Sequence, residues 1–342
     1  MQFKYILPLF ALAFAVCLAS CEEEKQTSVD NTSTVQPETK PTKKYNVPKF
    51  EGDSAYSYVA KQLSFGPRVP NKEGHKAAKE WLVSQFKAFG ADVIEQDFQA
   101  KAHWGETLNA TNIIAQYNPT AKKRIIFAAH WDSRYVADHD PESGNQITPV
   151  PGADDGGSGV GVLLEVARQL QANPIDAADL GVDIILYDAE DQGNDGGQDP
   201  TSWCLGSQYW SRNLHRPGYR AKYGILLDMV GAKNPRFGYE SYSKQYAPQV
   251  LNKVWSLAGS MGYSALFPRE NTGYTTDDHV PVNEITKIPM IDIINKPLGS
   301  ETSFVPHWHT VGDDMDAISK RTLRIVGQVM LAVTYREASG TL

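Results

Sequence analysis

The sequence predicts an α/β protein, a three-layer α/β/α sandwich around a central, mostly parallel mixed sheet. Short runs of apolar residues alternate along the chain with longer stretches of amphipathic helical pattern, as in strands joined by crossover helices. Each apolar run is continuous and ends in polar residues, which is typical of strands covered on both faces. No second linker and no repeat is visible, so one large domain is expected.

The individual elements follow from these patterns. Strands are predicted at 124–129, 182–187, 223–227 and 288–294. Helices are predicted at 72–89, 159–169, 207–213, 247–261 and 319–336.

The first 20 residues have the pattern of an export signal. Lys4 is followed by the apolar stretch 6–18, which is shorter than the ~20 residues of a membrane-spanning helix. Ala19 and Ser20 directly precede Cys21, as in a bacterial lipobox, where the cysteine is lipidated and becomes the new N-terminus. The alternative is an ordinary signal with a chance cysteine. In both cases we expect an exported protein.

The segment 21–48 is polar and predicts a disordered tether. The expected organisation is therefore a signal at 1–20, the tether, and a catalytic domain at 49–342. With a lipid on Cys21, the protein would be anchored to a membrane on its periplasmic side.

Charge and cysteine content narrow the possible partners and stabilising bonds. The formal net charge is −7 and no Lys/Arg cluster stands out, which argues against nucleic acid as a partner. Of the three cysteines, only Cys204 lies in the domain. No disulfide within the domain is then possible, and a lone thiol most often serves as packing.

Acidic residues and a histidine stand just past three predicted strands. In chain order they are His130 and Asp132, then Asp188, Glu190 and Asp191, then Asp228. Open α/β sheets bind ligands outside the carboxyl ends of their strands, so these side chains should converge. A single aspartate there is usually a cap or turn residue. Several together repel one another unless a cation lies between them, and this indicates a metal site.

Two further segments offer metal ligands. The glycine-rich turn 151–159 carries Asp154 and Asp155, and it lacks the Gly-Lys-Ser/Thr ending of a phosphate-binding loop. His307 and His309 alternate, so in an extended backbone only one of them can reach a given ion. Zn²⁺ accepts such nitrogen and oxygen ligands and keeps a position open in catalytic sites.

The adjacent acids Glu190 and Asp191 suit a division of labour. One carboxylate can hold the metal while its neighbour moves protons. The alternative is a solvated acidic loop, because "DAEDQGNDGGQD" also resembles a calcium-binding turn.

Taken together, the segments place the chain near a known family. "FGPRVPN", "AAHWDS", "PGADDGGSG", "LYDAEDQG", "LLDMVGAKNP", "DDHVPV" and "HWHTVGDD" occur in this order. In this the chain resembles the zinc aminopeptidase superfamily and, within it, the animal-type glutaminyl cyclases and their bacterial relatives. One departure is that animal members have Glu-Glu where this chain has Glu190-Asp191, so the liganding side chain is one methylene shorter.

The resemblance implies roles for particular residues. It makes Asp155, Asp191 and His309 the zinc ligands and Glu190 the proton-shuttling carboxylate. By the same likeness, Asp228 and Asp277 form a hydrogen-bond network with Glu190, and Trp308 and Trp203 line the substrate pocket. His130 and Asp228 match positions that hold a second zinc in two-metal aminopeptidases. Here His130 is either a ligand or a hydrogen-bonded core histidine. Asp132 could accept a hydrogen bond from a liganding histidine or from the network.

The expected function is that of a glutaminyl-peptide cyclotransferase, an acyltransferase that converts N-terminal glutamine of peptides or proteins to pyroglutamate. One zinc ion per chain would polarise the γ-carbonyl, with Trp131 and Phe304 as further candidate walls. The first alternative is a two-metal aminopeptidase built from almost the same residues. The second is a binding protein that kept the fold and lost catalysis, which would predict damaged ligand positions that the chain does not have.

Overall fold

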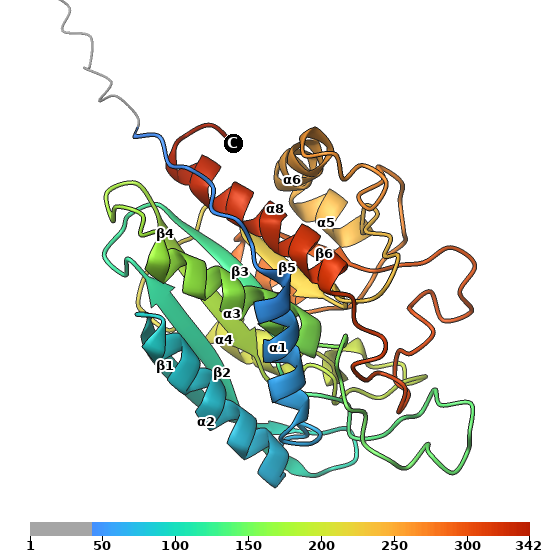
Figure 1. Cartoon of the computed structure of the whole chain (residues 1–342). Coiled ribbons are helices and arrows are strands. Elements are labelled where there is room, and N and C mark those ends of the chain that lie inside the picture. The colour runs from blue at the N-terminus through green and yellow to red at the C-terminus, as the bar shows by residue number, and fades with distance from the viewer. Residues whose placement is uncertain (1–42) are drawn as a thin grey trace, which may run out of the picture. The chain divides into compact units, whose positions relative to one another are not determined.

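A six-stranded mixed sheet forms the centre of the domain in the computed structural model, which describes residues 43–342 (Figure 1). The strand order is β1-β2-β4-β3-β5-β6. β1 and β2 are antiparallel, as are β2 and β4, whereas β4, β3, β5 and β6 run parallel. The strands are β1 (Asp92–Lys101), β2 (Thr107–Tyr117), β3 (Arg124–His130), β4 (Gly181–Tyr187), β5 (Gly224–Asp228) and β6 (Met290–Ile294).

Helices cover both faces of this sheet and confirm the three-layer α/β/α prediction. α1, α3 and α8 pack on one another in front of the sheet in Figure 1, with α2 against β1 and β2 and α6 against β6. α4 packs against β2 and the short helix Val282–Thr286. The helices are α1 (Gly52–Leu63), α2 (Glu73–Ala88), α3 (Gly157–Ala172), α4 (Leu205–Arg212), α5 (Ser241–Tyr246), α6 (Pro248–Ser260), α7 (His279–Pro281) and α8 (Lys320–Ala338).

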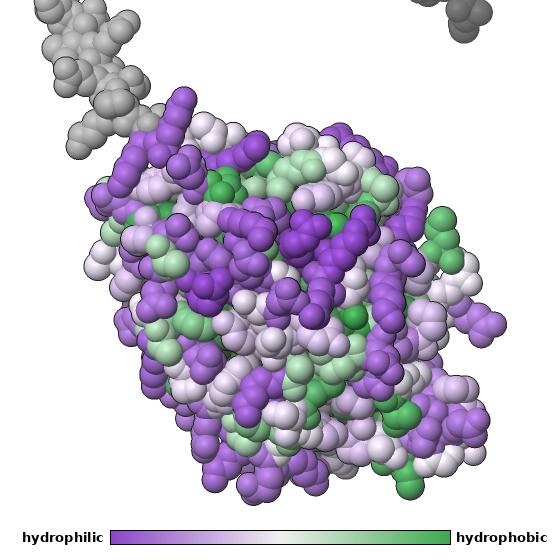
Figure 2. All heavy atoms as spheres, viewed as in Figure 1, coloured by the Kyte–Doolittle hydropathy of each residue, from purple (hydrophilic) through white to green (hydrophobic). Residues whose placement is uncertain are grey.

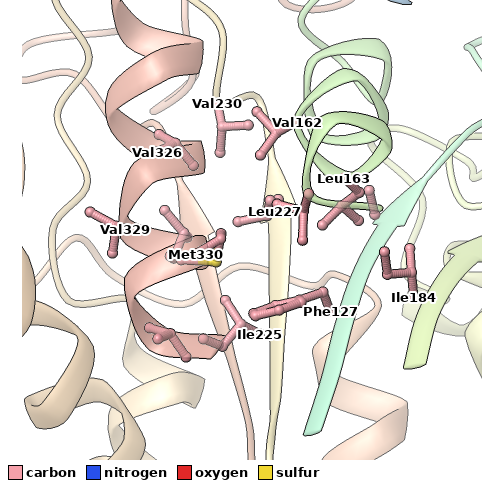
Figure 3. Close-up of a cluster of buried hydrophobic side chains, with 14 of the residues drawn as sticks. Phe127, Val162, Leu163, Ile184, Ile225, Leu227, Val230, Val326, Val329 and Met330 are labelled. Carbon is pink, nitrogen blue, oxygen red and sulfur yellow. The ribbon is translucent and has the colours of Figure 1, made fainter. Parts of the chain in front are cut away.

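Alternate residues of the central strands enter two separate cores. Phe127 of β3 lies with Leu163 of α3 and Leu227 of β5 in the larger core (Figure 3), while its neighbour Ala128 belongs to a smaller core with Trp210. This explains the continuous apolar runs, because both faces of each strand are buried. Removing a buried phenylalanine side chain such as Phe127 typically costs about 3–5 kcal/mol.

The helical face seen in Figure 2 carries mostly hydrophilic residues, with apolar ones scattered among them. From residue 43 onward, no helix combines the length and the apolarity needed to cross a bilayer.

The sequence prediction lacked α1, β1 and β2, as well as the short helices α5 and α7. β1 is an edge strand with a partly exposed, polar pattern. β2 is buried along most of its length, yet it contains Asn112 and Gln116, whose side chains hydrogen-bond inside the fold. Such polar residues hid the strand pattern.

Contacts with the rest of the domain also begin before the expected boundary at residue 49. The Tyr45 hydroxyl donates to Asp179 Oδ2 at 2.6 Å, and the Tyr45 backbone N–H donates to Ser339 Oγ at 3.0 Å. The end of the predicted tether is thus attached to the domain. The signal at 1–20, Cys21 and the tether up to residue 42 lie outside the described residues.

Candidate zinc and substrate site

The carboxyl ends of the parallel strands bring together side chains from distant parts of the chain. β3 ends at His130 and β5 at Asp228, while the loop after β4 carries Glu190 and Asp191. In the sheet register His130 lies beside Tyr187, the last residue of β4. The strands therefore stop at a common edge, as a ligand site of an open α/β sheet requires.

Asp155, Asp191 and His309 meet at this edge. One ligand atom from each side chain lies within 4.8 Å of the other two, and all three residues are buried. His309 Nε2 is 2.9 Å from Asp191 Oδ1 and 3.9 Å from Asp155 Oδ2. These are the three residues that the family resemblance implied as zinc ligands.

Asp155 reaches the edge through the glycine-rich turn before α3. A Cβ at Gly156 would come within 2.5 Å of the His130 carbonyl oxygen, so only glycine allows this approach. Asp154, the first acid of the pair, turns away and pairs with His307 Nε2 at 2.9 Å.

Only one of the two alternating histidines reaches the ligand group, but the backbone is not extended there. The segment around His309 is a series of turns, and His309 itself has φ +53°. Three more non-glycine residues with positive φ flank the site, namely Ala189, Cys204 and Met229. Left-handed backbone at non-glycine residues is strained and is often found at functional sites.

Asp132 fixes the acidic loop. Its two carboxylate oxygens accept the backbone N–H groups of Glu190 and Asp191, each at 3.1 Å, and Oδ2 also accepts from the Gln192 side chain at 3.0 Å. Asp132 Oδ1 lies 3.6 Å from His130 Nδ1. Asp132 therefore fixes the loop that carries Glu190 and Asp191, while its carboxylate lies close to His130.

Glu190 lies beside the ligand group in a crowded acidic setting. Burial raises its pKa well above the usual value, and the charges of Asp191 and Asp277 raise it further, against the lowering effect of His130. The thiol of Cys204 is 3.4 Å from Glu190 Oε1. A carboxyl with a raised pKa can both take up and release a proton near neutral pH.

His130 forms a second group that shares Asp155 with the first. Its Nε2 is 2.9 Å from Asp155 Oδ1 and 3.3 Å from Asp228 Oδ1. The backbone N–H of Gly156 also donates to this nitrogen at 3.0 Å. Burial raises the pKa of Asp228 to about 8, with added repulsion from Asp277 and Asp155.

A pocket of about 670 Å³ opens next to these groups. It is lined by the three ligand residues, Glu190, Asp228 and Asp277, and by aromatic and polar side chains that include Trp203, Trp308, Phe304, Tyr274 and Lys296. A Cβ at Gly193 would overlap the Trp203 ring, so glycine is needed for this wall to form. Trp131, a candidate wall in the sequence analysis, is instead a core residue that stacks on His75 and donates to the Thr111 carbonyl oxygen.

Sequence reasoning missed Arg134, which connects three parts of the site. Its guanidinium donates to the Asp191 and Gly193 carbonyl oxygens at 3.1 and 3.2 Å, and to both carboxylate oxygens of Asp138 at 2.8 and 2.5 Å. The same group lies over the Trp203 ring, 4.8 Å from its centroid.

The carboxylate of Asp138 continues this connection to a ligand residue. Its Oδ1 lies 3.3 Å from His309 Nδ1, opposite the nitrogen that faces Asp191. A carboxylate behind a histidine in this way orients the ring toward a metal.

The ligand group fits a zinc ion. Two carboxylates and one imidazole supply oxygen and nitrogen donors, and the pocket leaves a further position open, as catalytic zinc requires. In addition, Asp191 Oδ2 is buried and accepts no hydrogen bond from the described residues. A cation between the three side chains would satisfy that oxygen and reduce the repulsion between Asp155 and Asp191.

Comparison with known proteins agrees with this geometry. Residues 112–334 match the model of peptidase family M28. The chain belongs to this family. It is 49% identical to a glutaminyl cyclase of Bacteroides thetaiotaomicron solved with N-acetylhistamine, covering 85% of this chain and 99% of that one at a TM-score of 0.82.

Two further relatives extend the comparison. A Zn-dependent exopeptidase from Parabacteroides distasonis is 48% identical, covering 85% of this chain and 99% of that one at a TM-score of 0.82. Glutaminyl-peptide cyclotransferase of Drosophila melanogaster is 25% identical over 276 residues, 75% of this chain and 73% of the relative. Within family M28 the chain is therefore placed with the glutaminyl cyclases, as its motifs indicated.

Proposed function

We propose that this protein is a zinc-dependent glutaminyl-peptide cyclotransferase. It converts the N-terminal glutamine of peptides or proteins to pyroglutamate and releases ammonia. The observation that carries the proposal is the pocket in which Asp155, Asp191 and His309 lie beside Glu190, in a chain 49% identical to a solved glutaminyl cyclase.

The residues divide the chemistry between them. Asp155, Asp191 and His309 would hold one zinc ion, which polarises the γ-carbonyl of the substrate and stabilises the negative charge that develops on its oxygen. Glu190 accepts a proton from the α-amine of the substrate while the nitrogen of this amine bonds to the γ-carbon. Glu190 then gives a proton to the departing ammonia as the amide C–N bond breaks, and so returns to its starting state.

The remaining pocket residues shape the substrate and its surroundings. Asp277 lies close to Glu190 and its charge raises the pKa of that carboxyl, while Asp228 lies against His130. Because the attack is intramolecular, Trp203 and Trp308 need only fold the glutamine side chain back and exclude water from it.

One assay tests the proposed reaction. The purified domain is incubated with a peptide that begins with glutamine and with the same peptide beginning with alanine, and the products are weighed. We expect the first to lose one ammonia and the second to stay unchanged. Release of free amino acid from either peptide would instead support a peptidase.

The His130 group favours a second candidate, a two-metal aminopeptidase. His130, Asp155 and Asp228 form a buried cluster that shares Asp155 with the first one. In that reaction the two groups would hold two metal ions that activate a water molecule, and Glu190 would take up a proton from this water as it attacks the peptide bond. Metal counting by mass spectrometry separates the two candidates, since the cyclase proposal expects one zinc ion per chain.

The N-terminal sequence supports a proposal about location. A lipid on Cys21 would anchor the exported enzyme to a membrane, where exported proteins that begin with glutamine are its substrates. Replacing Cys21 with serine should move the protein from the membrane to the soluble fraction. Comparing protein N-termini in cells with and without the enzyme tests the substrates.

A further inference from the structure

Lys296 is a buried lysine on the wall of the substrate pocket. It stands two residues after β6, is 5% exposed, and is the single lysine or arginine among the described residues that line this pocket. The other charged groups of the lining are mostly carboxylates. A buried ammonium is unfavourable unless its N–H groups find acceptors, so the contacts of Lys296 show what it can still bind.

Two other residues of the pocket wall hold the ammonium. It donates to Thr275 Oγ1 at 3.0 Å and lies over the Phe304 ring, 4.2 Å from its centroid. The Lys296 backbone N–H donates to the Arg236 carbonyl oxygen at 3.1 Å, which fixes the base of the side chain. Within residues 43–342 the ammonium makes no further hydrogen bond and no ion pair. Because an ammonium has three donors, one N–H is left for a molecule in the pocket.

This free donor lies near the place of the substrate α-amine. Thr275 is two residues before Asp277, and ligand atoms of Asp277 and Glu190 lie within 4.8 Å of each other. Burial lowers the pKa of Lys296, while nearby acids that include Asp228 and Asp277 act in the opposite direction. In the proposed reaction Glu190 takes a proton from the α-amine, so the amine lies within reach of the wall that carries Lys296.

The substrate offers one further acceptor at this point. The α-carbon of an N-terminal glutamine carries the amine, the side chain and the backbone carbonyl. In the cyclisation the amine faces Glu190 and the γ-carbonyl faces the zinc ligands, which leaves the backbone carbonyl. Trp203 and Trp308 stack on the His309 ring and so cover the zinc side of the pocket. The wall with Lys296 is then the one that supplies a donor to this carbonyl oxygen.

We propose that Lys296 is a specificity-determining residue whose ammonium donates a hydrogen bond to the backbone carbonyl oxygen of the N-terminal glutamine. This bond orients the α-carbon so that the amine meets Glu190, and it favours the end of a peptide over a simple amine. The inference rests on the proposed cyclase function and adds how the first backbone carbonyl of the substrate is recognised.

A double-mutant cycle between enzyme and substrate measures this bond. Glutaminamide is compared with 4-aminopentanamide, in which a methyl group replaces the backbone carboxamide, and both can cyclise with loss of ammonia. We expect the wild type to prefer glutaminamide in kcat/KM and Lys296→Met to lose about tenfold or more of this preference, the effect of one hydrogen bond to a charged group. The intrinsic reactivities of the two amines cancel, because each enzyme meets the same pair.

The control variant makes the same substitution outside the pocket lining. Lys233 is exposed and its ammonium donates to the Asp316 carbonyl oxygen at 2.7 Å, so Lys233→Met should keep the wild-type preference. If Lys296→Met does not fold, Lys296→Gln, which removes the charge and shortens the side chain, carries the same expectation. An equal loss of kcat/KM for both compounds would mean that Lys296 only compensates the charge of the buried acids, and the proposal would be wrong.

Calorimetry tests the same bond without turnover. Isoglutamine, which has a γ-carboxylate in place of the γ-amide, is compared with 4-aminopentanoate, which lacks the backbone carboxamide. The wild type should bind isoglutamine more tightly, and Lys296→Met should lose about tenfold or more of this difference. A wild type that shows this difference but forms no pyroglutamate contradicts the cyclase proposal alone. The same discrimination in both enzymes overturns the role of Lys296 even if cyclisation is established.

Discussion

Arg134 offers a sharp test of how the ligand side chains are kept in place. Lysine at this position keeps the positive charge and loses the planar fork that reaches two carbonyl oxygens and both oxygens of Asp138. His309 then loses the fixed carboxylate behind its Nδ1, and the Asp191 loop loses two backbone contacts. Both changes loosen zinc ligands without removing one.

The expected loss of zinc affinity follows from the position of Arg134 and Asp138 behind the ligand residues. Partners behind metal ligands typically contribute 10- to 100-fold in affinity, so Arg134→Lys should weaken zinc binding by about that factor, or roughly 1.4–2.8 kcal/mol. The Asp138 side chain is 28% exposed, and water can therefore replace part of its lost contact. The KM should also rise, because the guanidinium no longer supports the Trp203 ring.

Competition with a chelator measures the zinc dissociation constant directly. The matched control is Arg168→Lys. Arg168 also donates to both carboxylate oxygens of an acid, those of Glu165, each at 2.7 Å. It lies on α3, outside the pocket lining. Equal zinc affinity in the wild type and in Arg134→Lys would refute the reasoning.

Three further outcomes are expected. Glu190→Gln should abolish cyclisation while zinc stays bound, and residual turnover near the wild-type rate would show that another group moves the proton. Gly193→Ala should displace the Trp203 ring and raise KM about tenfold or more with little change in kcat, as steady-state kinetics can check. Burial alone would raise the pKa of Asp138, but Arg134 and His309 hold this pKa below its usual value. Ionised Asp138 therefore stabilises the fold above a pH of about 4. The stability difference between the wild type and Asp138→Asn, from urea unfolding, should then shrink as the pH falls below that value, and a constant difference would contradict the assignment.

Strands made of continuous apolar residues could be predicted from the sequence. β3 and β4 are buried along their whole length, and their apolar runs gave nearly correct bounds. Acidic segments after the strands predicted the edge of the sheet where the candidate ligands meet, because strand ends converge in any parallel sheet. The choice of Asp155, Asp191 and His309 came from the family resemblance. β2 was missed because Asn112 lies inside it, where its amide is satisfied by Gly206 and Asp188 of distant segments.

Residues that act through tertiary contacts left no local signal. Arg134 follows a predicted strand, and arginine is a residue type that is usually exposed. Its partners come from the loops at 138 and 191–193. Asp292 lies in a predicted apolar strand, and only the fold brings it close to Asp277, which lies 15 residues earlier.

The most direct test of the whole account is anomalous diffraction at the zinc absorption edge from crystals of the active protein. We expect one strong peak within bonding distance of the side chains of Asp155, Asp191 and His309. Full cyclase activity in a protein whose zinc peak lies elsewhere, or is absent, would contradict the account.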